Sequence, residues 1–481
     1  MSKYGFSITI MLTELVLVFG VFLYLGRMAP IIWIILVILV SLATIVSIVN
    51  RSMNPESKVT WLLVAFVPVF GPLLYIMVHR EDNSRALRLE LKEQDKSAYG
   101  VIKSLLSMDT NADVYDQTDT KFFASGESMW QQMLEDLRKA EKFIFLEYYI
   151  VEEGLMWNSI LEILGEKVAQ GVEVKMLYDD IGCMATLPGD YTIQLRGRGI
   201  EAHKFNKVIP RLTVAYNNRD HRKILIIDGQ IAYTGGVNLA DEYINHVERF
   251  GYWKDSGIRL DGLAVKALTR LFLATWYINR GEISDFDQYH LENQPRDGQG
   301  FCIPYSSGPK PIYRAQVGKT VYQNLINQAT DYIYITTPYL IIDYDLTESI
   351  KNASLRGVDV RIVTPYIPDK KVIQLVTRGA YLDLLSAGVR IYEYSPGFLH
   401  SKQMIVDGEV ATVGTINFDY RSLVHHYENA VLLYRTQSIL DIAEDFRGIF
   451  QVSREINSYT IKPRWYQTLI KEIVQLFAPM L

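Results

Sequence analysis

Two copies of one histidine-containing pattern are the residues of this 481-residue chain whose types and spacing suit catalysis. Both copies follow the order His-x-Lys-x4-Asp-x6-Gly-x2-Asn. The members are His221, Lys223, Asp228, Gly235 and Asn238 in the first copy, and His400, Lys402, Asp407, Gly414 and Asn417 in the second. Each residue of the second copy lies 179 positions after its counterpart, since 400 − 221 is 179. Because the chain has only eight histidines, this match indicates an internal duplication.

The side chains of the two copies suit the cleavage of a phosphodiester. Two imidazoles, two ammonium groups and two amides that converge across a pseudo-two-fold axis make a cationic pocket rich in hydrogen-bond donors. One neutral histidine would attack phosphorus in line, and the other, protonated, would donate a proton to the leaving oxygen. We expect Lys223, Lys402, Asn238 and Asn417 to bind the phosphate oxygens.

Each copy is predicted to lie on a β-strand that ends in a tight turn. Residues two apart on a strand point to the same face, so the histidine and lysine of each copy share a surface. An apolar run follows each lysine and ends at an Asp-Gly turn. Asp228 and Asp407 therefore stand at strand ends with the opposite parity to their histidines. We count them with the catalytic motifs but do not expect a His-Lys-Asp triad.

This chemistry requires no metal or other cofactor. A zinc site is not expected, because no His-x3-His or Cys-x2-Cys spacing accompanies the histidines. The chain has two cysteines, Cys183 and Cys302, far apart in sequence. Their scarcity is typical of a reducing compartment.

The segments around the motifs resemble the phospholipase D superfamily, and in detail its bacterial cardiolipin synthase branch. The resemblance extends from about Trp61 to the C-terminus. The segments that carry it are YDDIG (178–182), HRK (221–223), TGGVN (234–238), GYWKD (251–255), TPY (337–339) and GTINFDYRS (414–422). It implies an α/β protein of two tandem phospholipase D-like repeats with the active site between them. It further implies phosphatidyl transfer through a phosphohistidine, with His221 as nucleophile and His400 as general acid.

The resemblance also supplies candidates for the groups that orient the histidines. In similar enzymes an acidic residue downstream of each histidine holds an imidazole, and here Asp255 and Glu428 follow the histidines of their own copies by 34 and 28 positions. A carboxylate that accepts the Nδ1 proton fixes the tautomer and raises the basicity of the ring. The alternative is that both are surface carboxylates. Where the family often has Leu-Asn-Phe-Glu, this chain has His-His-Tyr-Glu, so a place in the pocket for His425 or His426 stays open.

The N-terminal region, residues 1–79, is predicted to be a membrane anchor. The apolar stretches 8–26, 31–49 and 59–78 are each about as long as a bilayer core requires of a helix. We expect two to three transmembrane helices. The third stretch contains Pro68, Gly71 and Pro72, so it is either a kinked span or a re-entrant hairpin.

Basic residues beside the apolar stretches predict the orientation. If all three cross, one flank collects Lys3, Arg51 and Lys58, while the other collects Arg27, Arg80, Arg85, Arg88 and Lys92. The more basic side faces the cytoplasm in membrane proteins. We therefore expect a multi-pass protein of the cell membrane with its catalytic region in the cytoplasm.

The rest of the chain has the pattern of an α/β protein. We expect a linker over 80–110, a first repeat over 111–295 and a second over 296–481. Residues 206–220 of the first repeat form an insertion, which we expect to be a loop at the mouth of the site. The second repeat ends in an amphipathic helix over 465–477, either on the bilayer surface or packed on the core.

Net charge and the apolar N-terminus narrow the substrate class. The formal charge is −5, whereas a nuclease is expected to present a basic surface. Nucleic acid is therefore not an expected partner, and phosphatidylglycerol and other membrane phospholipids are. A catalytically inactive lipid-binding scaffold is disfavoured because every motif position is filled.

The expected reaction is that of a cardiolipin synthase: reversible phosphatidyl transfer between two phosphatidylglycerol molecules, which gives cardiolipin and glycerol. Two alternatives share its first half-reaction. Attack by water would make the protein a phospholipase D that produces phosphatidic acid, and attack by serine would make it a phosphatidylserine synthase-like transferase. The sequence makes no prediction of the oligomeric state.

Overall fold

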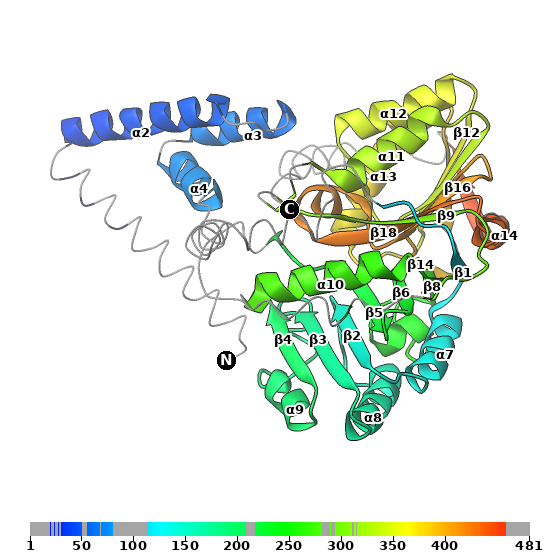
Figure 1. The fold of residues 1–481 in the computed structure, drawn as a ribbon. Helices are drawn as coiled ribbons and strands as arrows, with labels where there is room; N and C mark the ends of the chain where they lie inside the picture. The colour runs from blue at the N-terminus through cyan, green and yellow to red at the C-terminus, as the bar shows by residue number, and fades with distance from the viewer. Residues whose placement is uncertain are drawn as a thin grey trace. The chain divides into compact units, whose positions relative to one another are not determined.

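The computed structural model describes residues 20, 24, 27, 30–50, 55–67, 69–79, 113–207, 217–280, 289, 294–309, 312, 313 and 315–457. The chain divides into two compact units. One contains the N-terminal helices, and the other contains both copies of the histidine motif (Figure 1).

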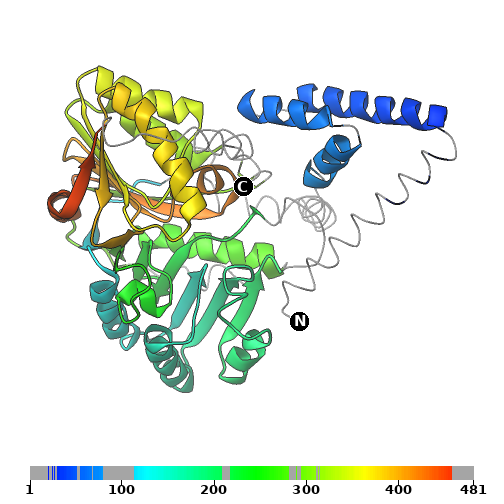
Figure 2. The same cartoon turned by 180° about the vertical axis from the view of Figure 1, so that it is seen from behind.

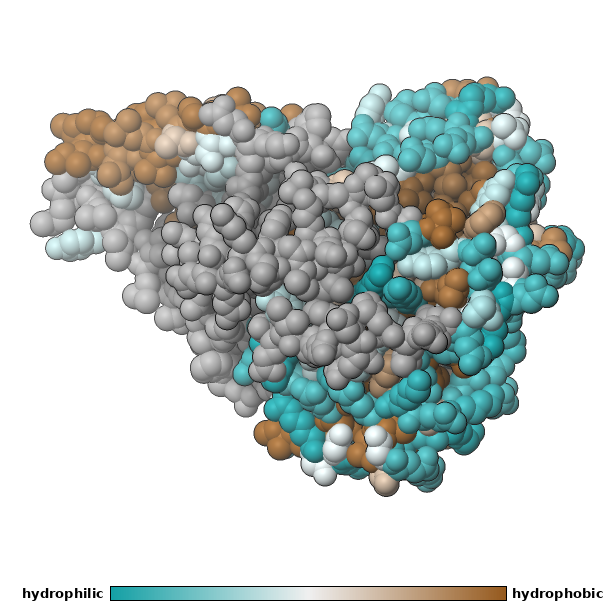
Figure 3. Space-filling view, in the orientation of Figure 1, coloured by the Kyte–Doolittle hydropathy of each residue, from teal (hydrophilic) through white to brown (hydrophobic). Residues whose placement is uncertain are grey.

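The N-terminal unit contains α2 (Pro30–Asn50), α3 (Pro55–Ala65) and α4 (Phe70–His79). Pro30–Val49 is the one helix among the described residues that is long and apolar enough to cross a membrane, with a mean hydropathy of 3.0. Its surface is strongly hydrophobic (Figure 3). This helix coincides with the predicted stretch 31–49. The stretch 8–26 lies outside the described residues apart from Gly20 and Tyr24.

The third predicted stretch, 59–78, is not one continuous helix. It divides into α3 and α4 at a turn in which Val69 has a φ of 66°. The two helices approach so closely that a Cβ on Gly71 would lie 1.8 Å from the carbonyl oxygen of Val64. Trp61 and Tyr75 pack edge to face across the turn with ring centroids 5.4 Å apart. Of the two alternatives for this stretch, the structure therefore has a hairpin of two helices rather than a single kinked span, since Pro72 is tolerated only in the first turn of a new helix.

Two mixed β-sheets form the framework of the unit that contains both motif copies, residues 90–207 and 218–471, which is called the catalytic unit from here on. The first sheet has the order β1-β8-β6-β5-β2-β3-β4, and the second has the order β19-β13-β12-β10-β15-β16-β18-β9. The strands of the first are β1 (Thr118–Phe123), β2 (Phe143–Tyr148), β3 (Glu173–Asp179), β4 (Glu201–Phe205), β5 (Lys223–Ile227), β6 (Ile231–Gly235) and β8 (Gly257–Gly262). The strands of the second are β9 (Phe301–Ser307), β10 (Tyr332–Thr336), β12 (Asp359–Pro365), β13 (Arg390–Tyr394), β15 (Gln403–Val406), β16 (Val410–Gly414), β18 (Glu428–Tyr434) and β19 (Ser453–Ile456).

Read from β9, the second sheet repeats the first strand for strand, with β19 added at its edge. In both sheets three neighbouring strands are parallel, β2-β3-β4 and β10-β12-β13, and the others pair antiparallel. The shared strand order shows that the duplication predicted from the sequence is also present in the fold.

Helices cover both faces of each sheet, as Figures 1 and 2 show. They are α7 (Gly126–Leu137), α8 (Leu155–Ala169), α9 (Tyr191–Gly197), α10 (Val265–Arg280), α11 (Val317–Gln328), α12 (Tyr344–Leu355), α13 (Lys371–Ser386) and α14 (Ser438–Val452). One buried cluster joins the two repeats, with Phe145 and Ile226 from the first sheet, Val413 from the second, Phe272 from α10 and Phe446 from α14. Because the central strands are buried on both faces, they read as continuous apolar runs rather than alternating ones.

Short pairings also cross between the repeats near the motifs. β7 (Tyr252–Lys254) runs parallel to β14 (Gly397–Leu399), and Asp220 forms a bridge with Tyr427. The residue before His221 thus pairs with the residue before Glu428. The residues before His400 pair with those before Asp255. The linker 80–110, most of the insertion 206–220 and the helix 465–477 lie outside the described residues.

Candidate active site

The two motif histidines are anchored by the opposite repeat. The backbone N–H of His221 donates to the carbonyl of Tyr427 at 2.9 Å, and that of His400 donates to the carbonyl of Lys254 at 2.7 Å. Each of these carbonyls belongs to the residue just before an acidic residue. The crossed pairings therefore place a carboxylate beside each imidazole.

The imidazole rings use those carboxylates in a crossed pattern. Nδ1 of His221 donates to Glu428 at 2.9 Å from Oε1 and 3.0 Å from Oε2, and Nδ1 of His400 donates to Oδ2 of Asp255 at 2.7 Å. Because an ionised carboxylate only accepts, Nδ1 carries the proton and Nε2 keeps its lone pair. The two predicted orienting residues thus lie at the site, each on the histidine of the other repeat.

Both carboxylates are fully buried and held in turn. Oδ1 of Asp255 accepts the backbone N–H of Ser256 at 2.9 Å, and Oε2 of Glu428 accepts the hydroxyl of Thr415. Burial opposes ionisation, but the adjacent imidazoles outweigh it and hold the pKa of each carboxyl below its ordinary value. A Cβ on Gly236 would lie 2.0 Å from Oδ1 of Asp255, so this position requires glycine.

The motif lysines are buried and contact the backbone of their own motif histidines. Lys223 and Lys402 are each 1% exposed, and each Nζ donates to the carbonyl oxygen of its own motif histidine. Burial lowers the pKa of Lys223 to about 7, which Glu428 opposes and Lys402 reinforces. Burial also lowers the pKa of Lys402 to about 8, which Asp255 opposes. Because a carboxylate of the other repeat holds each motif histidine, the charges of the two motifs act on one another, and an entering anion would favour the ammonium forms.

Burial also sets the protonation of the histidines. It lowers the pKa of His221 to about 3 and that of His400 to about 4, although the paired carboxylates oppose it. Lys223 and Lys402 add to the lowering. A neutral imidazole at pH 7 suits a nucleophile. A general acid needs a proton, and the negative charge of a bound phosphodiester favours its uptake.

The motif asparagines lie close to this site with protein partners already in place. Asn238 accepts the N–H of Ile150 at 3.0 Å and donates to the hydroxyl of Tyr243 at 2.7 Å. Asn417 donates to Asp419 at 2.9 Å, while its Oδ1 has no hydrogen-bond partner among the described residues. Each amide nitrogen has a second N–H, so phosphate binding by these residues stays a prediction.

The motif aspartates are not at the site. Asp228 accepts the backbone N–H groups of Glu141, Lys142 and Phe143 at 2.7 to 2.9 Å, at the end of β5 opposite to His221. Asp407 accepts three N–H groups at the start of β10 in the same way. Both have a positive φ, 53° and 52°. Their inclusion among the catalytic residues is therefore corrected: each fixes the turn of its hairpin against the neighbouring strand.

Of the two histidines left open by the sequence, His426 lies at the site. Its ring centroid is 5.3 Å from that of His221, and its Nδ1 is 3.5 Å from Oε1 of Glu428. The ring of His425 instead lies against Tyr420, at 5.8 Å. His221, His426 and Glu428 are the one group in the described part of the chain with the spacing of metal ligands. Glu428 already accepts hydrogen bonds from His221 and Thr415.

Aromatic residues that the motif does not reveal form walls around the imidazoles. Tyr149 lies edge-on to His221 with centroids 5.0 Å apart, and Tyr243 and Trp253 lie 5.4 and 5.3 Å from the ring of His400. Trp253 belongs to the GYWKD segment, whose family resemblance could have indicated that this residue lies near the site. No spacing in the sequence marks the two tyrosines.

Comparison with known proteins places both motif copies in one family. A family model described as "Cardiolipin synthase, PLD-like domain" matches residues 133–250 and 322–451, and each segment holds one copy of the motif. An uncharacterized protein of Streptococcus mutans is 41% identical over 462 residues, 91% of this chain and 99% of that protein. A cardiolipin synthase of Alkalihalophilus pseudofirmus is 35% identical over 458 residues, 90% of each chain.

The fold has a counterpart among solved structures. Phosphatidylserine synthase of Haemophilus influenzae Rd KW20 matches with a TM-score of 0.58 and 16% identity, over 79% of this chain and 97% of that one. At this level of identity the likeness concerns the fold. The matched part of this chain is longer than either repeat alone, so the likeness includes residues of both sheets.

Proposed function

The chain belongs to the cardiolipin synthase family with phospholipase D-like domains, and from this membership we propose that it joins two phosphatidylglycerol molecules into cardiolipin and glycerol. It is a phosphatidyltransferase. The observation that carries the proposal is the pair of crossed histidine–carboxylate contacts, because it supplies two oriented imidazoles with free Nε2 atoms.

In the first half-reaction Nε2 of His221 attacks the phosphorus of a phosphatidylglycerol. The bond from phosphorus to the glycerol oxygen breaks, and His400 donates its Nε2 proton to that oxygen. Glu428 stabilises the positive charge that develops on His221, since its carboxylate accepts the Nδ1 proton. Lys223 and Lys402 stabilise the nonbridging oxygens. The products are a phosphatidyl-histidine and free glycerol.

In the second half-reaction the terminal hydroxyl of another phosphatidylglycerol takes the place of glycerol. Neutral His400 accepts the hydroxyl proton, the oxygen attacks phosphorus and the bond from phosphorus to His221 breaks. Cardiolipin is released and both imidazoles return to their first state. Both half-reactions exchange an alcohol oxygen and the His221 nitrogen on the same phosphorus, so the reaction is reversible.

The substrate lies in a membrane, and the N-terminal helices support a membrane location. Pro30–Val49 has the length and composition of a spanning helix. We place the protein in the cell membrane as a multi-pass protein, with the catalytic unit on the cytoplasmic side. The basic residues on that flank of the apolar stretches, Arg80, Arg85 and Arg88 among them, support this orientation.

The test is a product analysis with the purified full-length protein in phosphatidylglycerol vesicles. Mass spectrometry of lipids and water-soluble products, without added divalent metal, should find cardiolipin and glycerol in equal amounts. Phosphatidic acid with glycerol would instead mean that water is the acceptor. Added serine that is converted to phosphatidylserine in preference to cardiolipin would likewise overturn the proposal.

A further inference from the structure

Lys254 connects His400 to a buried ion pair that lies outside the active site. Its backbone carbonyl accepts the N–H of His400 at 2.7 Å and that of Ser401 at 3.2 Å. The next residue, Asp255, accepts the Nδ1 proton of the same histidine. The position of Lys254 therefore fixes both the backbone of His400 and the group that orients its ring.

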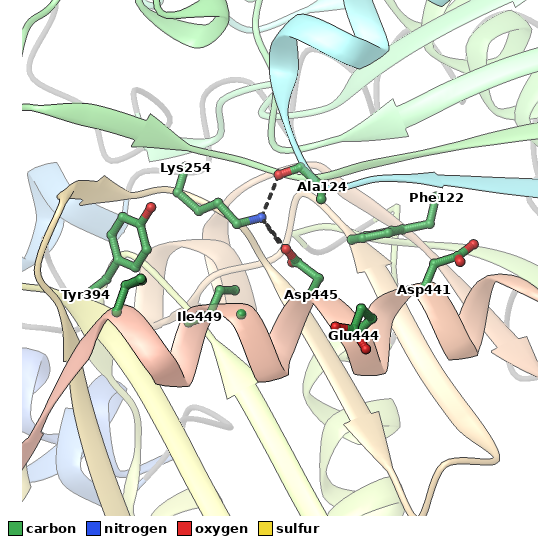
Figure 4. A pocket seen from close by; sticks show the side chains of 10 residues that line it. Phe122, Ala124, Lys254, Tyr394, Asp441, Glu444, Asp445 and Ile449 are labelled. Atoms are coloured by element: carbon green, nitrogen blue, oxygen red, sulfur yellow. Dashed lines mark hydrogen bonds and ion pairs between the residues drawn. The ribbon is translucent and has the colours of Figure 1, made fainter.

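The side chain of Lys254 extends into a cavity of about 520 Å³ beside α14 (Figure 4). Its Nζ donates to the carbonyl of Ala124 at 2.6 Å and lies 2.9 Å from Oδ1 of Asp445. The side chains of the pair are 7% and 8% exposed. A largely buried ammonium group needs such a partner, because removal of the carboxylate leaves a charge without compensation.

Asp445 also holds a second strand next to His400. Its Oδ2 accepts Nε2 of Gln403 at 2.8 Å, and Gln403 begins β15 immediately after Lys402. One carboxylate on α14 thus joins β7, which carries Lys254, to β15, which carries Gln403. β7 accepts the backbone N–H of His400, and β15 begins three residues after this histidine.

The other half of the active site lacks this arrangement. Tyr427 takes the place of Lys254 before Glu428, and its ring lies 5.2 Å from the guanidinium of Arg222. Ile224 takes the place of Gln403 after Lys223. The buried ion pair of this half is instead Arg222–Glu147, at 2.8 Å, and it holds the residue after His221 rather than the residue before Glu428. The duplication has diverged at the histidine that transfers protons.

We propose that Asp445 and Lys254 are positioning residues for His400, which set the direction of its Nε2 proton toward the leaving oxygen. The proposal rests on the role given above to His400. Neither side chain contacts the reacting atoms. A misplacement of about 1 Å in a catalytic group costs up to about a hundredfold in rate, so loss of the pair should act through geometry.

The test uses full-length Asp445→Asn and two donors, phosphatidylglycerol and a phosphatidyl ester of p-nitrophenol. Nitrophenolate leaves without a proton, so it does not need His400 in the first half-reaction. We expect glycerol release from phosphatidylglycerol to fall about tenfold to a hundredfold at unchanged KM, and the nitrophenolate burst to stay near that of the wild type. Asp441→Asn, an exposed carboxylate on the same helix and cavity, is the matched control and should change neither rate.

Equal losses with both donors, or undiminished glycerol release, would overturn the proposal. If Asp445→Asn fails to fold, Gln403→Leu takes its place, because the equivalent position already accommodates Ile224. It removes one contact of Asp445 and should give a smaller loss with the same dependence on the leaving group. Glycerol release reports the first half-reaction whatever the acceptor, so a failure of the cardiolipin assignment would appear separately, in the lipid product.

Discussion

Neutral amides in place of the two buried carboxylates test which histidine each carboxylate serves. Glu428→Gln and Asp255→Asn keep the shape of the side chain, and each amide oxygen can still accept a hydrogen bond from the Nδ1–H group. In the structure Glu428 contacts His221 at 2.9 Å, and Asp255 contacts His400 at 2.7 Å. Each substitution therefore removes only the charge that stabilises the imidazolium form of its partner.

The magnitude follows from the burial of both contacts. A hydrogen bond to a charged group contributes about 1.5 to 3 kcal/mol and one to a neutral group about 0.5 to 1.5 kcal/mol, so exchange of the carboxylate for an amide costs about 1 to 1.5 kcal/mol. Both carboxylates are 0% exposed, so solvent does not screen this loss. Since about 1.4 kcal/mol corresponds to a factor of ten, the affected step should slow by about 5-fold to 10-fold.

The assay compares glycerol release from phosphatidylglycerol with the nitrophenolate burst from phosphatidyl p-nitrophenol. Glu428→Gln should slow both, because His221 attacks phosphorus in each case. Asp255→Asn should slow glycerol release and spare the nitrophenolate burst, because only glycerol needs a proton from His400. His400→Ala provides the reference pattern for a lost general acid. The opposite assignment, with Asp255→Asn slowing both donors and Glu428→Gln only one, would refute the crossed pairing.

Three further predictions follow from single contacts. Asp228→Ala should lower stability by about 2 to 4 kcal/mol, because three backbone N–H groups lose their acceptor, while kcat of the folded enzyme stays the same; thermal unfolding and kinetics check this, and a large loss of kcat would restore a catalytic role. Gly236→Ala should reproduce the donor pattern of Asp255→Asn, because its Cβ would displace that carboxylate; activity with both donors equal to that of the wild type would contradict the close approach. The lowered pKa values of His221 and His400, about 3 and 4, mean that the unfolded chain binds more protons below about pH 6.5, so the stability is complete above that pH and is lost as the pH falls toward about 4. Melting temperatures across that range should fall less steeply for the variant in which both histidines are replaced by asparagine, and equal slopes would count against the shifts.

The sequence predicted the parts of the site better than their pairing. The repeated spacing identified His221 and His400, and the resemblance to the phospholipase D superfamily supplied Asp255 and Glu428 by their distance after the histidines. Counting could not reveal that each acid serves the other histidine, because that depends on the pairing of β7 with β14 between repeats. Such long-range pairings leave no periodic signal in the chain.

The alternation of side chains along a strand predicted the position of the motif aspartates better than their membership of the motif did. It separated Asp228 from the face of His221, and the structure finds this carboxylate at the far end of β5. At the N-terminus the length of 59–78 suggested a span, whereas Gly71 and its neighbouring prolines signalled the hairpin that the structure has. Local backbone chemistry decided that case, and hydropathy alone did not.

The most direct test of the central claim is to locate the covalent intermediate. His400→Ala, incubated with phosphatidyl p-nitrophenol and quenched at alkaline pH, should retain a phosphatidyl group, because cleavage of this donor needs no proton, while cleavage of the bond from phosphorus to His221 lacks the base that activates the acceptor. Peptide mass spectrometry should find the group on His221. A phosphatidyl group on any other residue, or none in a variant that still releases a burst of nitrophenolate, would contradict the two-histidine mechanism.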